Sequence, residues 1–82
     1  MKKQTRKEYY RDDVFLRAVG EKIRLLRQKK GFTQMELAFK CNDKDYSQIN
    51  RVELGKVNFS VSYLSLISDA LNVKVKELLP DN

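Results

Sequence analysis

Hydrophobic residues recur at steps of three and four along most of this chain, and no segment alternates over the length of a β-strand. The first such stripe predicts a helix from Asp12 or Asp13 to Lys30 and consists of Phe15/Leu16, Val19, Ile23 and Leu26. Comparable patterns predict helices over residues 33–41, 45–54 and 60–71, then a short fifth helix that ends at Pro80. In the fourth helix the inward positions are expected to be Val61, Leu64, Ile67, Ala70 and Leu71. We therefore predict an all-α fold of five helices.

Capping residues predict where the long helices begin and end. Asp12 or Asp13 can accept hydrogen bonds from the first amides of the first helix. Gly31 and Gly55 can adopt the left-handed conformation that ends the first and the third helix. Ser60 is placed to cap the fourth helix in the same way.

The second and third helices are both short and both have clear start signals. Thr33 and Glu36 form a capping box, in which each side chain bonds the backbone amide of the other residue. Residues 42–44 (Asn-Asp-Lys) predict a turn, after which Asp45 is expected to cap the third helix and to form a second box-like pair with Gln48. Two short capped helices joined by a tight turn are typical of the helix-turn-helix motif.

Composition narrows the range of functions. At 82 residues and 41% hydrophobic content the chain fits one domain, expected over residues 12–82 after a basic, flexible arm over residues 1–11. One cysteine, no histidine and three scattered glycines give no support for a metal site, a cofactor or an enzyme, so a cytosolic binding module is expected. The net charge of +6 is concentrated in the first 30 residues, which suits DNA, RNA or an anionic membrane, or simply solvated helix faces.

Several segments together resemble the phage repressor/Cro-like helix-turn-helix proteins. They are residues 23–31, the TQMELA segment at 33–38, SQINRVELGK at 47–56, and the leucine, isoleucine and alanine spacing over 64–73. The resemblance covers roughly residues 20–79 and implies a five-helix bundle of the lambda-repressor type. Between Leu37-Ala38 and Ile49 this chain has one residue more than the family pattern, which we place in the 42–44 turn.

The resemblance implies which residues contact DNA. The third helix would enter the major groove, and the residues expected to read bases are Tyr46, Ser47, Gln48, Asn50 and Arg51. Ile49 and Val52 would face the core, which leaves most of these side chains on the outward side. The residues expected to contact phosphates are Gln34, Lys56, Asn58, Thr33 and Lys44. The basic arm (Lys2, Lys3, Arg6, Lys7 and Arg11) could add diffuse attraction or a minor-groove contact.

Two further expectations concern pairing. The family often joins an arginine of the first helix to the glutamate that ends the recognition helix, and Arg27 and Glu53 occupy those positions, so we predict a structural ion pair. Members also commonly dimerise through their C-terminal helices. Apolar residues that remain after the core is assigned predict a homodimer interface at Tyr63, Leu66, Val75 and Leu79.

The resulting hypothesis is a bacterial or phage transcription regulator, cytoplasmic and associated with the nucleoid. It would bind an inverted repeat in double-stranded DNA as a homodimer and act by blocking or touching RNA polymerase. No small-molecule ligand, cofactor or membrane is expected as a partner. The alternative is an antitoxin-like or adaptor module whose main partner is another protein. A basic helix on a membrane surface is disfavoured, because the stripe of the first helix is needed for the core.

Overall fold

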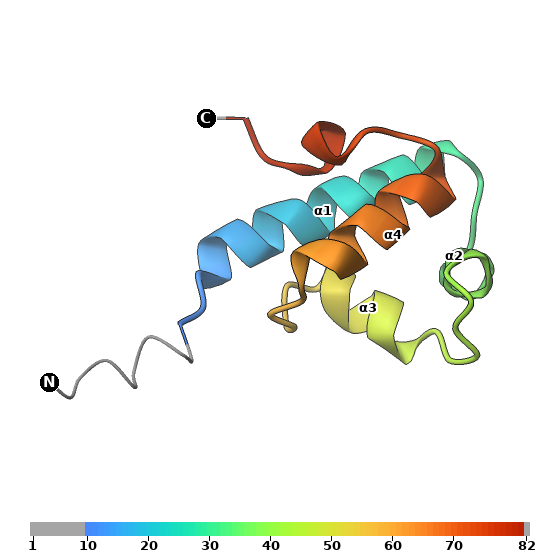
Figure 1. Cartoon of the computed structure of the whole chain (residues 1–82), viewed down its shortest axis with the longest axis horizontal. Coiled ribbons are helices and arrows are strands. Elements are labelled where there is room, and N and C mark those ends of the chain that lie inside the picture. Colours follow the sequence, from blue (N-terminus) through green and yellow to red (C-terminus); the bar gives the residue numbers. More distant parts are fainter. Residues whose placement is uncertain (1–9, 82) are drawn as a thin grey trace, which may run out of the picture.

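The computed structural model describes residues 10–81, and all the regular structure in this range is helical (Figure 1). It contains α1 (Asp13–Lys29), α2 (Gln34–Lys40), α3 (Ser47–Glu53) and α4 (Val61–Leu71). A single turn of 3₁₀ helix follows, η2 (Val75–Leu78). Among the described residues no helix has the length and apolar character needed to cross a bilayer. Of the expected basic arm, Lys2, Lys3, Arg6 and Lys7 lie outside the described residues.

The prediction of a fifth α-helix is wrong, because the 3₁₀ turn η2 occupies that part of the chain. Asn72 ends α4 in the left-handed conformation with φ of 58°, and Lys74 is extended. Leu79 precedes Pro80 and is also extended, as a residue before proline prefers to be. These two breaks leave only Val75–Leu78 between them, enough for one helical turn.

Most of the predicted helix ends are confirmed. Asp12 Oδ1 accepts from the Phe15 amide at 3.0 Å, and Ser60 Oγ accepts from the Tyr63 amide at 3.0 Å. The capping box of α2 is complete, because Thr33 Oγ1 accepts from the Glu36 amide (3.0 Å) and Glu36 Oε1 from the Thr33 amide (2.8 Å). The left-handed glycines that follow α1 and α3, with φ of 80° and 75°, are Gly31 and Gly55.

The start of α3 differs from the expectation. Asp45 makes no box with Gln48; its carboxylate instead accepts from the amide (3.0 Å) and hydroxyl (2.9 Å) of Ser47, two residues on. These bonds stabilise the charged form and lower the pKa of Asp45. The reason is that Tyr46 already has helical dihedral angles, so the α3 amide nearest to Asp45 belongs to Ser47.

The core lies where α3 packs against α1 and α2, with α4 and η2 closing the other side. Its fully buried residues come from every element and include Val19, Ile23, Leu37, Ile49, Val52, Ile67, Leu71 and Leu78. Two residues expected in the core are exposed, Phe15 (44%) and Val61 (81%). Both lie in the first turn of a helix, beyond the part of α1 and α4 that the neighbouring elements cover.

Tyr63 packs against the core with a polar atom that forms no hydrogen bond in the described part of the chain. Its hydroxyl is buried and has no hydrogen-bond partner within residues 10–81, and its ring lies 6.4 Å from that of Phe59. An unpaired buried hydroxyl costs stability, so we expect Tyr63→Phe to raise the free energy of unfolding by about 1 kcal/mol. Urea denaturation of both proteins at neutral pH measures this difference, and a less stable Phe variant would contradict it.

The same substitution should alter the response to alkaline pH. Burial, with smaller effects of Cys41 and Asp43, raises the pKa of Tyr63 from 10.0 to about 12. The folded state therefore holds this proton more tightly than the unfolded state. The stability that comes from keeping this proton bound is fully present below pH 10 and is lost as the pH rises through 12. Between pH 10 and 12 the wild type should lose more thermal stability than Tyr63→Phe, whereas parallel losses would contradict the assignment.

Candidate nucleic-acid interface

The outward side of α3 carries the polar residues that the sequence analysis selected. Ile49 and Val52 are fully buried, which fixes the rotation of the helix. Tyr46 is 46% exposed and Arg51 is exposed, while Ser47, Gln48 and Asn50 are half-buried. In Figure 1 α3 lies along the lower edge of the molecule, with α2 beside it. The geometry therefore leaves a short, polar helix face open to a partner.

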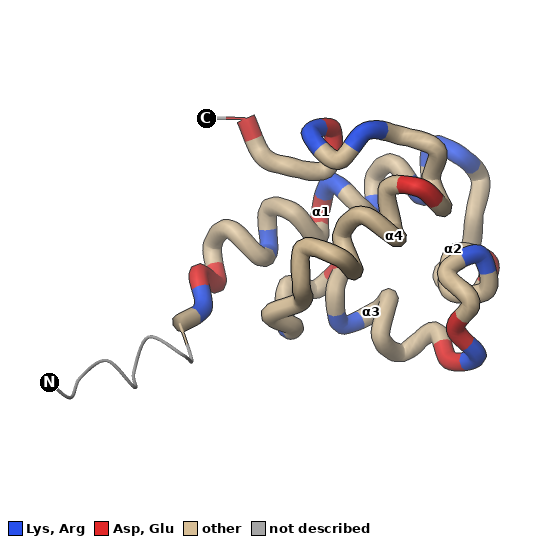
Figure 2. The backbone as a smooth tube through the Cα atoms, viewed as in Figure 1, with Lys and Arg blue, Asp and Glu red and all other residues tan. Residues whose placement is uncertain are grey.

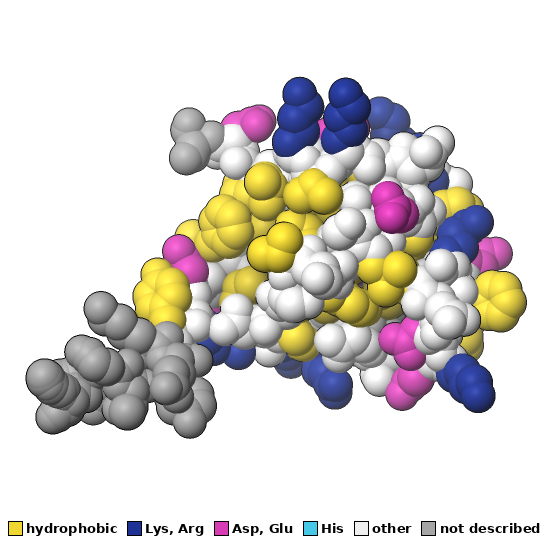
Figure 3. Space-filling view, in the orientation of Figure 1, with side chains coloured by type: hydrophobic (Ala, Val, Ile, Leu, Met, Phe, Trp, Pro, Cys, Tyr) yellow, Lys and Arg dark blue, Asp and Glu magenta, His cyan; other side chains and the backbone are white. Residues whose placement is uncertain are grey.

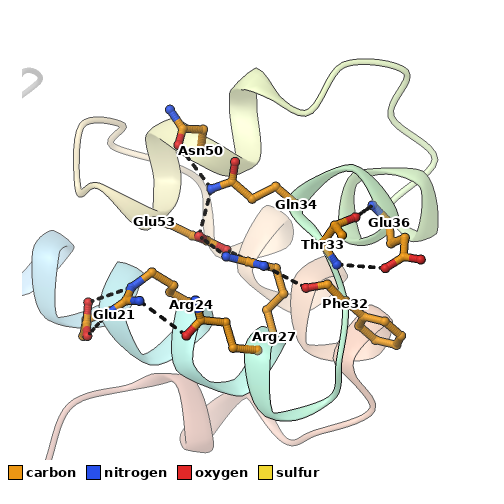
Figure 4. A network of polar contacts seen from close by, with 10 residues as sticks. Glu21, Arg24, Arg27, Phe32, Thr33, Gln34, Glu36, Asn50 and Glu53 are labelled. Carbon is orange, nitrogen blue, oxygen red and sulfur yellow. Dashed lines mark hydrogen bonds and ion pairs between the residues drawn. The ribbon is translucent and has the colours of Figure 1, made fainter.

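A network of hydrogen bonds connects this face to the interior (Figure 4). Gln34, the first residue of α2, donates from Nε2 to Asn50 Oδ1 at 3.1 Å and to Glu53 Oε1 at 3.0 Å. Arg27 of α1 donates from Nε and Nη2 to the two oxygens of Glu53, at 2.6 and 3.0 Å. Three helices thus meet at Glu53, and the position of α3 is fixed relative to α1 and α2.

Arg27 and Glu53 form the ion pair that the sequence analysis predicted. Both residues are buried, with 8% and 5% of their surface exposed. The third arm of the guanidinium, Nη1, donates to the carbonyl oxygen of Phe32 at 2.7 Å, so all three nitrogens of Arg27 are bonded. A buried pair stabilises a fold only when its geometry is good and its remaining polar atoms are satisfied, and here both conditions are met.

The residues expected to contact phosphates differ in how free they are. Lys44 in the α2–α3 turn and Lys56 after α3 are exposed. Thr33 is occupied by the capping box, and both hydrogens of the Gln34 amide are used within the chain. Asn58 donates to the carbonyl oxygen of Tyr10 at 2.9 Å. Of these five, only the two lysines present a free cation.

Arg11, expected in the flexible arm, is bound to the loop that follows α3. Its Nη1 and Nη2 donate to the carbonyl oxygens of Lys56 (3.3 Å) and Gly55 (3.4 Å), and its Nε pairs with Asp13 at 3.0 Å. The chain before α1 therefore runs beside the end of α3, and a basic side chain is fixed there.

The charges around α3 are not uniform. Figure 2 shows acidic residues in the turn between α2 and α3, which contains Asp43 and Asp45. In Figure 3 several basic side chains lie along the lower edge to the left of these acidic side chains, and another lies to their right. A polyanion approaching α3 would thus meet more positive charge at its C-terminal end than at the turn, where Lys44 lies between Asp43 and Asp45. Asp45 accepts two hydrogen bonds from Ser47 at the start of α3, and Asp43 Oδ1 accepts from the Asp45 amide at 3.5 Å within the turn.

The four residues expected at a dimer interface lie in two places. Val75 and Leu79 line an apolar groove of about 400 Å³ together with Phe15 and Val61. Hydrophobic side chains cluster in this part of Figure 3, at the upper left. Tyr63 and Leu66 do not line the groove, and the hydroxyl of Tyr63 is buried. Sequence reasoning missed Phe15 and Val61 because their spacing matches the core stripe; their position in a first turn was the available signal.

Comparison with known proteins identifies the family. A model of the helix-turn-helix family matches residues 23–78, which includes α2, the turn and α3. The chain belongs to the helix-turn-helix family. Within residues 10–81 this family member has no group of three or more histidine, cysteine, aspartate or glutamate side chains placed to hold a metal ion.

Several relatives of this helix-turn-helix protein are controller proteins. It is 39% identical over 61 residues to control protein C.BamHI of Bacillus amyloliquefaciens. The aligned residues cover 73% of this chain and 74% of that protein. Its fold matches the restriction-modification controller protein C.AhdI of Aeromonas hydrophila, with a TM-score of 0.74, 34% identity, and coverage of 78% and 96% of the two chains. It also matches the controller C.Esp1396I, solved as a tetramer in complex with its natural 35 base-pair operator. That match has a TM-score of 0.67, 32% identity, and coverage of 77% and 92%.

Proposed function

We propose that this chain is a sequence-specific regulator of transcription that inserts α3 into the major groove of double-stranded DNA. The observation that carries the proposal is the Arg27–Glu53–Gln34 network, which holds α3 rigidly while its polar side stays open. An α-helix fits the width of the major groove, and a helix that is already fixed loses little conformational freedom on binding. The function is regulation by occupancy, not catalysis, on a genome in the bacterial cytoplasm.

Within this proposal the outward residues have different roles. Arg51 can donate two hydrogen bonds to guanine, and Tyr46, Ser47, Gln48 and Asn50 lie close enough to contact neighbouring base pairs. Lys44 and Lys56 can contact phosphates on either side of the groove, joined by the backbone amide of Gln34. Asn58 and Arg11 hold the loop from which Lys56 projects.

We further propose that the protein binds as a homodimer on an inverted repeat. One short helix contacts few base pairs, and a second copy related by two-fold symmetry doubles the contacts. The apolar groove with Phe15, Val61, Val75 and Leu79 at its walls is the surface that favours self-association. The tetramer of C.Esp1396I on its operator supports assembly on DNA. Control of restriction–modification genes, with the operator placed to affect RNA polymerase, fits the controller relatives.

Selection of bound duplexes from a random pool tests both proposals. Enrichment of an inverted repeat is expected, because a symmetric dimer presents α3 twice. The salt dependence of binding gives a second measure, since phosphate contacts predict a steep loss of affinity as salt rises. No enrichment, together with weak salt dependence, would favour the alternative in which another protein is the main partner.

Arg51 and Lys56 should separate sequence reading from phosphate binding. We expect Arg51→Ala to weaken binding to the selected site by about 1–3 kcal/mol and to relax the preference at one base pair per half-site. Lys56→Ala should weaken binding to all sequences alike and reduce the salt dependence. Competition with selected and scrambled duplexes measures both effects. Equal losses on the two duplexes for Arg51→Ala would contradict its role in base reading.

A further inference from the structure

The orientation of two side-chain amides follows from the chemistry of Glu53. An ionised carboxylate only accepts hydrogen bonds, so the Gln34 atom that lies 3.0 Å from Glu53 Oε1 must be the nitrogen. The same nitrogen lies 3.1 Å from the side chain of Asn50, and its second hydrogen requires an acceptor there. The Asn50 atom next to Gln34 is therefore the oxygen. The buried ion pair thus sets the orientation of an amide on the DNA-facing helix.

This orientation limits what Asn50 can offer to a base. A free asparagine pairs with adenine by turning both amide atoms to its edge, where the oxygen accepts from N6 and the nitrogen donates to N7. In Figure 4 the oxygen of Asn50 points to Gln34, and its nitrogen points away from the network. With the oxygen turned inward the two-bond pairing with adenine is lost, and Asn50 presents hydrogen-bond donors alone.

Gln48 and Arg51, which neighbour Asn50 on α3, also present hydrogen-bond donors to a partner. Arg51 can only donate, and its Nη2 donates to Gln48 Oε1 at 3.4 Å, which engages the amide oxygen of Gln48 as well. The polar edge of α3 formed by Gln48, Asn50 and Arg51 therefore presents mainly donors. Guanine carries two acceptors, N7 and O6, in the major groove, whereas adenine replaces the second with an amino group that donates.

We propose that Gln34 is a positioning residue for specificity: by holding the Asn50 oxygen inward, it makes the protein select guanine over adenine at the base pair that Asn50 faces. This inference rests on the proposed function, because it needs α3 in the major groove. Gln34 acts through Asn50 and does not have to touch a base. A preference of about fivefold or more for guanine is expected at that pair in the wild type.

Base preference measured with three variants tests the proposal. Asn50→Ala locates the base pair, as the one position where selectivity falls. Gln34→Met, which keeps the length of the side chain but has no amide, should free Asn50 to turn toward adenine and reduce the guanine preference there to about twofold or less. Asn50→Asp should still accept from Gln34 but present an acceptor outward, so guanine should become disfavoured. Other positions of the site should keep their preferences.

A matched substitution controls for the loss of a glutamine. Gln28 is exposed near the end of α1, and Gln28→Met should leave every base preference unchanged. Circular dichroism and thermal unfolding establish that each variant is folded before binding is compared. If Gln34→Met weakens binding to guanine and adenine duplexes by the same factor, the proposal is overturned while DNA binding stands. If the wild type enriches no sequence, the proposed function itself fails.

Discussion

Replacing Arg27 with methionine should lower the free energy of unfolding by about 3–5 kcal/mol. The substitution keeps the length of the apolar stem. It leaves the carboxylate of Glu53, a residue that is only 5% exposed, without its cation and held only by the Gln34 amide. A domain of this size has a total stability of roughly 4–12 kcal/mol, so a loss of that magnitude would leave a sizeable unfolded fraction near 37 °C. Urea denaturation followed by circular dichroism measures the change.

A double substitution distinguishes an unpaired charge from lost packing. Glu53→Gln added to Arg27→Met removes the buried charge and should recover part of the lost stability. Arg24→Met serves as the matched control. Arg24 pairs with Glu21 on the exposed surface of α1, where water screens the charges, so loss of that pair should change the free energy of unfolding far less than Arg27→Met does. If Arg27→Met were as mild as Arg24→Met, the pair could not be what fixes α3.

Gly20→Ala should lower the free energy of unfolding by up to about 3 kcal/mol. A Cβ built on Gly20 would lie 2.6 Å from the carbonyl oxygen of Glu53 and closer still to that of Val52. Both atoms belong to the backbone of α3, so no side chain can move aside and the helices must separate. The gain in helix propensity from alanine is about 1 kcal/mol and does not offset this cost.

Gly31→Ala is the matched control for Gly20. Nothing lies within 4 Å of a Cβ at Gly31, and only its φ of 80° disfavours alanine there, at a cost of about 1–2 kcal/mol. Gly20→Ala should therefore unfold at a lower temperature than Gly31→Ala in a thermal melt. Because α3 is displaced only in the first, DNA affinity at a temperature where both are folded should fall more for Gly20→Ala. The reverse order would show that α1 and α3 have room to separate.

The sequence predicted those features that depend on hydrogen bonds between near neighbours. The Thr33–Glu36 box, the Asp12 and Ser60 caps and the left-handed Gly31 and Gly55 all act within a few residues of the chain. The order of the helices followed from these signals, whereas the choice of α3 as the recognition helix came from the family resemblance. The same local reasoning placed the cap of α3 at Asp45 and paired it with Gln48, whereas the structure has Tyr46 in the cap position and bonds Asp45 to Ser47.

Contacts between distant residues were beyond local patterns. The Arg27–Glu53 pair was expected from family resemblance alone, since nothing in the spacing of residues 26 positions apart requires them to meet. Hydrophobic spacing could not show that Phe15 and Val61 lie outside the core, because burial of a helix's first turn depends on which element covers it.

By itself the amino-acid sequence determined where α1, α2 and α4 begin, and that a short polar helix follows a short capped one. Only the tertiary structure decided that Gly20 allows α3 to approach α1 closely, and which way the amides of Gln34 and Asn50 point. The physical reason is one of range. The hydrogen bonds of caps and turns join residues that are close in sequence. The orientation of a side-chain amide depends instead on the charged group that the folded chain brings next to it.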